Sequence, residues 1–385
     1  AQGRKKWPKS PHQLAPLPSM VKAEGKSWLE WVVGEQYSQA WKAVIRPPRN
    51  SYSVDELGPV RFNLGKSLYK RTDLRLKSPR GHVLECSHFL PARIPEEKQP
   101  CVVYLHGNSS SRLEALSVLP LLLPHEVSVF CLDLSGSGRS QGDYVSLGAR
   151  EEEDLCTALE YLRERTTVTS IGLWGRSMGA ATAIMRAAKD SRLAACVLDS
   201  PFSDLRTLAS ELVGQVVTLP KFLVDIGLEV VRSEIQSRAG FDPDLVLPIK
   251  CAPRARCPAL FGAAEDDSLV TSDHAQVLHN AWGGPRAIRF FSGGHNSERP
   301  AWFLEEASQF LADKLHGRAT ARSNPRSSSR VSSKEAKGTK RGGTVLAPAA
   351  APMSERSRAS PRPSTLRVRS PSESCRARKS LMTAR

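Results

Sequence analysis

The sequence predicts an α/β protein with a mostly parallel central sheet flanked by helices. The first observation behind this class is a series of short apolar runs, which are typical of strands buried on both faces. The second is that segments with helical spacing separate these runs. The third is that residues 317–385 contain no Phe, Tyr or Trp. The core must therefore be built from the part of the chain before residue 317.

We expect residues 1–68 to form a partly disordered N-terminal extension. Within it, the spacing of aromatic and apolar residues predicts a short amphipathic helix at 27–41, which IRPPRNSY then ends. RTDLRLKS (71–78) and HVLECSHFL (82–90) are joined by PRG and predict a hairpin of two strands. We place the folded domain at 69–316, so that it begins just before this hairpin.

The alternation of strand and helix continues to residue 315. Buried strands are predicted at 100–107, 127–134, 168–175, 193–200, 258–265 and 286–293. Helices are predicted at 112–123, 149–164, 178–188, 272–281 and 300–315. Helices of this length between successive strands indicate parallel pairing.

The segment 202–257 interrupts the alternation because it contains no convincing strand. Leucines at 205, 208 and 212 fall at helical spacing, and so do Leu223, Ile226 and Val230. Two helices inserted between strands would form a cap over the edge of the sheet where sites lie in α/β enzymes. The alternative is a long connection without a role.

The C-terminal segment 317–385 carries most of the basic charge. It contains 17 of the 55 Lys/Arg and 3 of the 39 Asp/Glu, so it accounts for +14 of the net +16. We expect it to be a disordered, basic tail rich in Ser, Arg and Pro. Weak contact with nucleic acid or an anionic membrane is the binding that such a charge favours. A tail without aromatic residues has nothing on which bases can stack.

The 8 cysteines are too sparse for a disulfide scaffold, and no pair has CxxC spacing. Several lie in apolar runs and are expected to be buried thiols in a reducing compartment. No run of 18 apolar residues is present. We therefore expect a cytoplasmic location, with peripheral membrane contact through the tail as the alternative.

A serine stands where one buried strand gives way to a helix. In LWGRSMGAA (173–181), Ser177 lies two residues from Gly175 and two from Gly179. A nucleophile elbow holds its serine in a strained backbone, and side chains two positions away would collide across the turn. A plain strand-to-helix turn is the other interpretation, but the placement favours a nucleophile.

A serine nucleophile needs a base to accept its proton. Three histidines, His274, His279 and His295, lie late in the domain. The first two fall in a predicted helix, where a surface position is usual. His295 lies in SGGHNSERP, after the last strand and at the same sheet edge as Ser177. We therefore favour His295 as the base.

The base in turn needs an acid that orients it. GAAEDDSLV places Asp266 and Asp267 directly after a strand, and Asp199 follows the preceding strand. Asp267 stands three residues before Val270, in the usual acid-x-x-apolar spacing, and is preferred. Asp266 and Asp199 remain alternatives at this point.

Donors for an oxyanion are expected at two backbone amides. HGNSSS (106–111) follows a predicted strand, so the natural pair is the N–H groups of Asn108 and Met178. The alternative makes HGN a simple turn. The glycines of DLSGSGRSQG do not have dinucleotide-binding spacing, and no Cys/His cluster predicts a metal. We therefore expect neither a cofactor nor a metal.

Together these motifs resemble the α/β-hydrolase superfamily, in its serine aminopeptidase-like (lysophospholipase-like) branch. The resemblance covers about residues 69–315, with HGNSSS, LDLSGSGRSQG, LWGRSMGAA, VLDSPFSDL, FGAAEDDSLV and SGGHNSERP in the order of that superfamily. RPPR (46–49) and RGHVLECSHFLP (80–91) are similar to largely uncharacterised plant and protist members. The resemblance implies a triad of Ser177, Asp267 and His295. The sequence departs from the superfamily at one point: Asp267 stands five residues after Gly262, where a separation of three is commoner. Asp266 therefore stays an alternative for the acid.

The function expected from the sequence is a serine hydrolase that cleaves an acyl ester, thioester or amide through an acyl-enzyme intermediate. Its partner would be a small acyl substrate or a short peptide. The alternative is an interaction protein without catalysis, which uses this fold as a scaffold and its basic tail for binding.

Overall fold

The computed structural model describes residues 41–93, 97–216 and 219–323. In this part of the chain, nine strands form one sheet in the order β1-β2-β3-β5-β4-β6-β7-β8-β9. The strands are β1 (Arg61–Leu64), β2 (Ser67–Lys77), β3 (Val83–Pro91), β4 (Gln99–Leu105), β5 (Ser128–Leu132), β6 (Val168–Arg176), β7 (Cys196–Asp199), β8 (Ala259–Ala264) and β9 (Arg286–Phe291). The predicted mostly parallel sheet is confirmed, since every pair from β5 to β9 is parallel.

The first strands are antiparallel. β2 pairs with β3 as the predicted hairpin, and β1 and β5 add to its two sides. β1 was not predicted: the sheet begins at Arg61, inside the segment 1–68 that the sequence assigned to an extension. Only Phe62 of the four residues of β1 is buried, so its sequence gives a weak strand signal.

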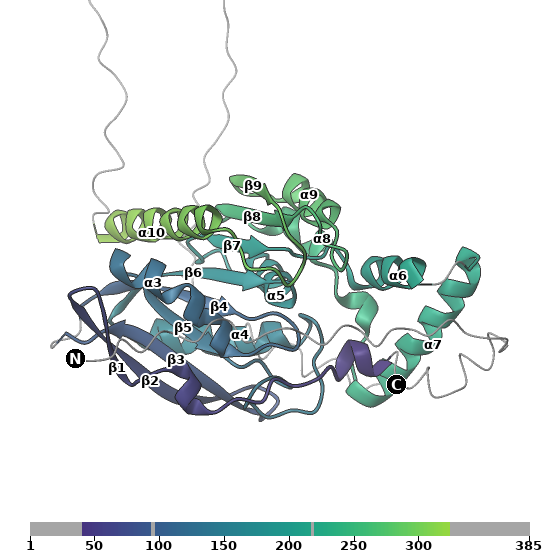
Figure 1. Cartoon of the computed structure of the whole chain (residues 1–385), viewed down its shortest axis with the longest axis horizontal. Coiled ribbons are helices and arrows are strands. Elements are labelled where there is room, and N and C mark those ends of the chain that lie inside the picture. The colour runs from purple at the N-terminus through teal and green to yellow at the C-terminus, as the bar shows by residue number, and fades with distance from the viewer. Residues whose placement is uncertain (1–40, 94–96, 217–218, 324–385) are drawn as a thin grey trace, which may run out of the picture. The chain divides into compact units, whose positions relative to one another are not determined.

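Helices cover both faces of the sheet (Figure 1). The α-helices are α3 (Leu119–Leu122), α4 (Glu151–Glu164), α5 (Met178–Ala187), α6 (Leu205–Val216), α7 (Lys221–Ala239), α8 (Pro248–Cys251), α9 (Ser272–Ala281) and α10 (Ala301–Ser323). Short 3-10 helices are η1 (Val54–Leu57), η2 (Arg112–Ser117), η3 (Leu123–His125), η4 (Pro243–Leu245) and η5 (Ala252–Arg254).

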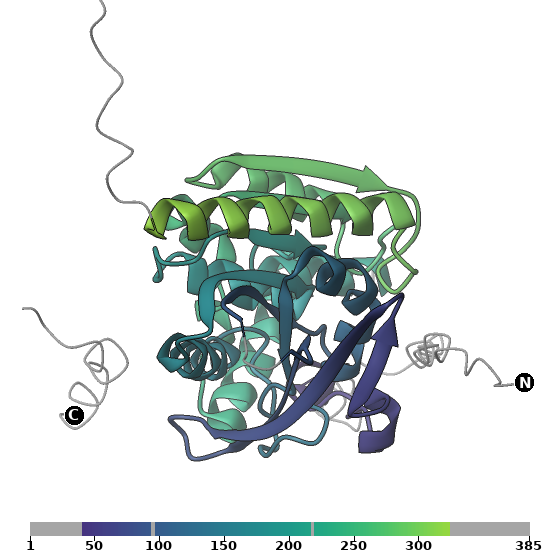
Figure 2. The same cartoon turned by 90° about the vertical axis from the view of Figure 1, so that its left-hand side faces the viewer.

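One face of the sheet is covered by α3 and α10 (Figure 2). Phe303, Ala307 and Leu311 are fully buried at intervals of four residues along α10, and they share a cluster with Val102 of β4 and Trp174 of β6. The opposite face packs against α4, α5, α8 and α9. Burial on both faces explains why the central strands are continuous apolar runs in the sequence.

The predicted helix at 112–123 is wrong as a single element. The chain forms η2, then the single turn of α3, then η3. Pro120 has no N–H to donate to the carbonyl of Leu116, so a continuous helix would lack that bond, and Pro120 lies in the first turn of α3. The Val118 amide before it bonds to Ala115, three residues back, in the 3-10 pattern. The last helix is longer than predicted, because α10 continues past the expected boundary at 317 to Ser323.

The segment 202–257 contains two long helices and, among its described residues, no strand, as predicted. Figure 1 shows α6 and α7 at one end of the sheet, on the right of the view. Gln215 of α6 donates from Nε2 to the carbonyl of Ser268 at 2.9 Å, so α6 lies beside the turn that follows β8. That these helices cap a substrate site stays a prediction.

The chain before β1 packs on the same domain. Residues 41–45 are helical, and Trp41 and Ile45 cluster with Ile235 and Ala239 of α7. Arg49, from RPPR, donates to the carbonyls of Gly136 at 3.0 Å and Gly142 at 2.7 Å. These bonds tie the extension to the glycine loop after β5. The remainder of the amphipathic helix predicted at 27–41, and the tail from residue 324, lie outside the described residues.

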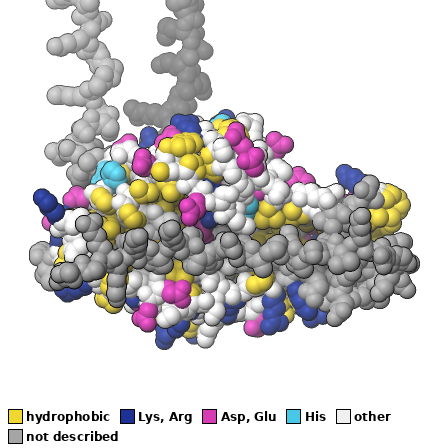
Figure 3. Space-filling view, viewed as in Figure 1, with side chains coloured by type: hydrophobic (Ala, Val, Ile, Leu, Met, Phe, Trp, Pro, Cys, Tyr) yellow, Lys and Arg dark blue, Asp and Glu magenta, His cyan; other side chains and the backbone are white. Residues whose placement is uncertain are grey.

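The surface of the described domain carries mixed charge. Figure 3 shows Lys/Arg and Asp/Glu side chains interspersed over one face, with hydrophobic side chains between them. The seven described cysteines are buried and unbridged, in line with the prediction of buried thiols. Among the helices that the structure describes, none has both the length and the apolar character to cross a bilayer.

Candidate active site

Ser177 lies on a sharp turn between β6 and α5. Its φ of 51° and ψ of −116° fall outside the conformations that an L residue adopts without strain. Its amide donates to the carbonyl of Asp199 at the end of β7, at 2.8 Å. Position, strain and support from the next strand are those of a nucleophile elbow.

The two glycines of GRSMG are required by close backbone approach. A Cβ on Gly175 would lie 2.3 Å from the carbonyl oxygen of Gly179. A Cβ on Gly179 would lie 2.1 Å from the carbonyl oxygen of Leu105, at the end of β4. Contacts this short are not seen for real side chains, so any side chain here would push β4, β6 and α5 apart. The collision across the turn that the sequence predicts is found at Gly175, whereas Gly179 is confined by β4 on the other side.

His295 lies in the loop after β9, and its imidazole contacts both predicted partners. Nε2 is 2.9 Å from Oγ of Ser177, and Nδ1 is 2.7 Å from Oδ2 of Asp267. A carboxylate can only accept, so Nδ1 carries the proton and Nε2 is left to accept from the serine hydroxyl. The ring is 9% exposed, which leaves this hydrogen-bonded chain largely shielded from water.

The geometry separates the three candidate acids. Asp267 is buried, and its second oxygen accepts from the amides of Leu269 at 3.0 Å and Val270 at 2.8 Å. The bond to Val270, three residues on, gives a structural reason for the acid-x-x-apolar spacing. Asp266 instead accepts from the amide of Gly293 at 3.0 Å. Asp199 forms an ion pair with Arg299 at 2.8 Å. Only Asp267 of these three contacts His295.

The other two late histidines are placed elsewhere. His279 is partly exposed on α9, with its ring against Phe261. His274 is buried, contrary to the surface position expected for it. Its Nδ1 lies 2.8 Å from Oγ of Ser203 and its Nε2 lies 2.9 Å from Glu211 of α6. Ser203 is not on an elbow, and its amide also donates to Nδ1, at 3.2 Å.

The turn after β4 lies beside the serine. A Cβ on Gly107 would be 3.9 Å from Cβ of Ser177. Asn108 folds its own side chain back to accept from the amide of Ser109, at 3.0 Å, and Ser109 has a φ of 60°. Met178 is the first residue of α5, so its N–H has no acceptor within the helix. Met178 thus follows Ser177 directly in the chain, and Asn108 follows Gly107, which lies beside Ser177. Their role in holding an oxyanion stays a prediction.

Charged residues around the elbow were missed by sequence reasoning. Arg176 and Glu114 form an ion pair at 3.2 Å, and Arg176 also donates to the carbonyl of His295 at 2.8 Å. Arg299 donates to the same carbonyl at 3.2 Å. Arg176 is visible inside the GRSMG motif, but no spacing in the sequence connects it with Glu114 or Arg299.

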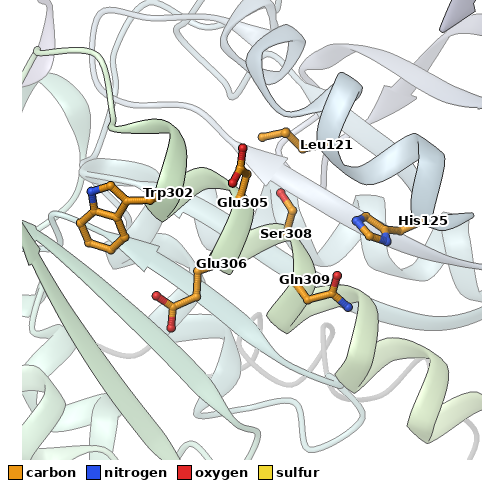
Figure 4. Close-up of a pocket in the computed structure, with 7 residues that line it drawn as sticks. All are labelled: Leu121, His125, Trp302, Glu305, Glu306, Ser308 and Gln309. Atoms are coloured by element: carbon orange, nitrogen blue, oxygen red, sulfur yellow. The ribbon is translucent and has the colours of Figure 1, made fainter. Parts of the chain in front are cut away.

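A cavity of about 380 Å³ lies on the α3 and α10 side of the sheet (Figure 4). Its lining includes Leu121, His125, Trp302, Glu305, Glu306, Ser308 and Gln309. None of the residues around the elbow lines it, so it is not the space in which Ser177 would meet a substrate. Within the described residues, no group of three His, Cys, Asp or Glu is arranged to hold a metal ion.

Comparison with known proteins agrees with this architecture. Residues 100–225 match the family model described as the alpha/beta hydrolase fold. The chain is 24% identical over 231 residues to the uncharacterized protein YqkD of Bacillus subtilis, a match covering 59% of this chain and 73% of that protein. It is 31% identical over 156 residues to Protein bem46 of Schizosaccharomyces pombe, covering 39% of this chain and only 49% of the relative.

Among solved structures, the esterase Pf2001 of Pyrococcus furiosus is similar with a TM-score of 0.54 and 19% sequence identity. The superposition covers 70% of this chain and 100% of the esterase. At this sequence identity the structural similarity shows a shared fold alone. The serine aminopeptidase-like branch, and the similarity to plant and protist members, stay predictions. The chain therefore has the alpha/beta hydrolase fold, shares it with known esterases, and matches the model of that fold family over residues 100–225.

Proposed function

We propose that the protein is a serine hydrolase that transfers an acyl group from an ester, thioester or amide to water. The observation that carries the proposal is the continuous chain of hydrogen-bonding distances from Ser177 through His295 to Asp267, at 2.9 and 2.7 Å. These distances lie within the reach that nucleophile, base and orienting acid need. The strained backbone of Ser177 supports the same role, because strain of this kind concentrates at functional residues.

In the proposed mechanism, Oγ of Ser177 attacks the substrate carbonyl while Nε2 of His295 takes its proton. Asp267 holds Nδ1–H and stabilises the imidazolium that forms. The amides of Asn108 and Met178 donate to the oxyanion. His295 returns the proton to the leaving group, and water then attacks the acyl-enzyme by the same route in reverse. Each step moves one proton through His295, between Ser177 or the attacking water and the departing oxygen, sulfur or nitrogen.

Esters are the first substrates to test. The similar structure of the Pyrococcus furiosus protein is described as an esterase, and the family model that matches describes a hydrolase fold. Purified protein should hydrolyse p-nitrophenyl esters, and a series from acetyl to dodecanoyl beside aminoacyl amides would define the acyl group. Ser177→Ala should reduce kcat to the buffer rate, since the nucleophile is removed.

Ser203→Ala is the matched control, because Ser203 also lies within 3 Å of a histidine ring but lacks the elbow. It should leave ester hydrolysis within a few-fold of the parent. Equal hydrolysis by the parent and the Ser177→Ala protein would refute the proposed function.

A further inference from the structure

Two charged side chains beside the elbow contact the loops on either side of it. Glu114 lies on η2, just after the HGNSSS turn. Its Oε2 accepts from the amide of Gly107 at 2.9 Å, and its Oε1 accepts from the hydroxyl of Tyr104 at 3.3 Å. The carboxylate therefore fixes the residue that directly precedes the proposed oxyanion donor Asn108.

Arg176 uses the two arms of its guanidinium for two different loops. Nη1 lies 3.2 Å from Oε1 of Glu114, and Nη2 donates to the carbonyl of His295 at 2.8 Å. A planar fork can make both bonds at once, which a lysine ammonium at this place does less well. The side chain leaves the backbone directly beside Ser177. Arg176 thus connects the elbow, the turn after β4 and the loop after β9 that carries His295, which we call the base loop.

The pair is shielded from water. The side chains of Arg176 and Glu114 are 22% and 11% exposed. Burial by itself raises the pKa of Glu114, but the charge of Arg176 and the Gly107 amide outweigh it and hold the pKa below its ordinary value. Glu114 is accordingly ionised at neutral pH, and each charge has the other as its partner. A buried pair of this kind is costly to break by removing one member.

From this geometry we infer that Arg176 and Glu114 are positioning residues. They hold the turn at Gly107 and Asn108 and the base loop in the correct position relative to Ser177. The inference rests on the proposed function. Neither side chain contacts the reacting Oγ or the imidazole nitrogens, so their effect passes through the backbone of Gly107 and His295. Arg299, in the same loop as His295, donates to the same carbonyl and pairs with Asp199 at the end of β7, so this loop is also tied to the sheet.

The test compares Arg176→Met, Arg176→Lys, Glu114→Gln and the double variant Arg176→Met/Glu114→Gln. For each, the measurements are kcat and KM on p-nitrophenyl acetate, the second-order rate of Ser177 labelling by a fluorophosphonate, and the melting temperature. Arg176→Met should lower kcat and the labelling rate by about 10- to 100-fold with KM within about twofold. The reason is that displacement of His295 and of the turn after β4 affects the reaction more than substrate binding. Arg176→Lys should recover part of this loss. The double variant should be no slower than the worse single variant, since the two residues act as one unit.

The control is another buried arginine–glutamate pair, Arg186 and Glu152, at 2.9 Å and with 8% and 7% exposure. Arg186→Met should lower the melting temperature and leave kcat of the folded protein unchanged. If Arg176→Met does not fold, Arg176→Lys carries the test. Parent values of kcat and labelling rate in the folded Arg176 variants would overturn the inference. Absence of labelling and hydrolysis in the parent protein would instead refute the proposed function and leave the pair a structural ion pair.

Discussion

Asp267 and its neighbour Asp266 turn in different directions, and only Asp267 reaches His295. Oδ2 of Asp267 lies 2.7 Å from Nδ1 of the imidazole, whereas Oδ2 of Asp266 accepts from the amide of Gly293. The buried acid also anchors the amides of Leu269 and Val270. The turn after β8 is therefore built around Asp267.

Replacing Asp267 should be far more harmful to catalysis than replacing Asp266. An amide in Asp267→Asn donates toward Nδ1 and favours the tautomer that cannot accept the serine proton, so kcat should fall by about 10⁴-fold. Asp266→Asn keeps an oxygen for the amide of Gly293, and its kcat should stay within about tenfold of the parent. The measurement is ester hydrolysis at neutral pH with the melting temperature of each protein. Similar losses in the two variants would show that the acid is misassigned.

The elbow glycines should tolerate no side chain. In Gly179→Ala the new Cβ would meet the Leu105 carbonyl at 2.1 Å, and forced overpacking of this kind costs about 1–3 kcal/mol of unfolding free energy or more. Gly227→Ala is the control, because a Cβ there meets nothing within 4 Å on α7. That variant should be stabilised by about 0.5–1 kcal/mol, since alanine has the better helix propensity. Urea denaturation measures both, and a destabilisation of equal size at both positions would contradict the close approach.

Acid unfolding should reveal the cluster around Asp190. Burial alone raises the pKa of this carboxyl, but its bonds to Arg163, Arg192 and Arg186 outweigh that effect and lower the pKa from 3.8 to about 2. The carboxylate is thus easier to ionise in the folded than in the unfolded chain. Its contribution to the free energy of unfolding is complete above about pH 4 and is lost as the pH falls through about 2.

The matching variant is Asp190→Asn. It should be less stable than the parent at pH 6, and the difference in unfolding free energy should shrink as the pH falls from 4 to 2. Denaturant titrations across this range provide the measurement. A difference that does not vary with pH would argue against a charged Asp190 as the source of the stabilisation.

The basic tail should be dispensable for hydrolysis. Residues 324–385 contain 15 Lys/Arg and 3 Asp/Glu, and their deletion leaves every helix and strand of the described domain in place. We expect unchanged kcat and melting temperature on deletion. We also expect the full chain, but not the deleted form, to bind vesicles containing phosphatidylserine at low salt, with affinity falling steeply as salt rises. Equal binding by both proteins would exclude the tail as the contact.

The sequence predicted those features that a short stretch of residues determines. The buried strands were visible because parallel strands covered on both faces are apolar throughout, and the elbow was visible because backbone contacts as close as those of Gly175 and Gly179 leave no space for a Cβ. β1 was missed because a four-residue edge strand with one buried side chain has no such pattern. The broken helix at 112–123 was missed because the apolar spacing continues across Pro120, although proline cannot donate the bond that a continuous helix needs.

Relationships across long sequence separations could be predicted only where a known motif marks both ends, as for Ser177 and His295. The spacing to Val270 favoured Asp267 over Asp266, but Asp266 stayed an alternative because the direction of each carboxylate depends on the packing of the turn. The bonds of Arg176 to Glu114 and His295 span 62 and 119 positions, so no motif contains them. The burial of His274 likewise follows from contact with α6, whose position relative to α9 is set by the whole fold.

Ser177 as an activated nucleophile is tested most directly by mapping where a fluorophosphonate becomes attached. Intact mass and peptide sequencing of the labelled parent protein should show one adduct, on the hydroxyl of Ser177, and the rate of its formation should collapse in His295→Ala. An unlabelled protein, an adduct on another residue, or labelling of Ser177 that is indifferent to loss of His295 would contradict the proposed hydrolase.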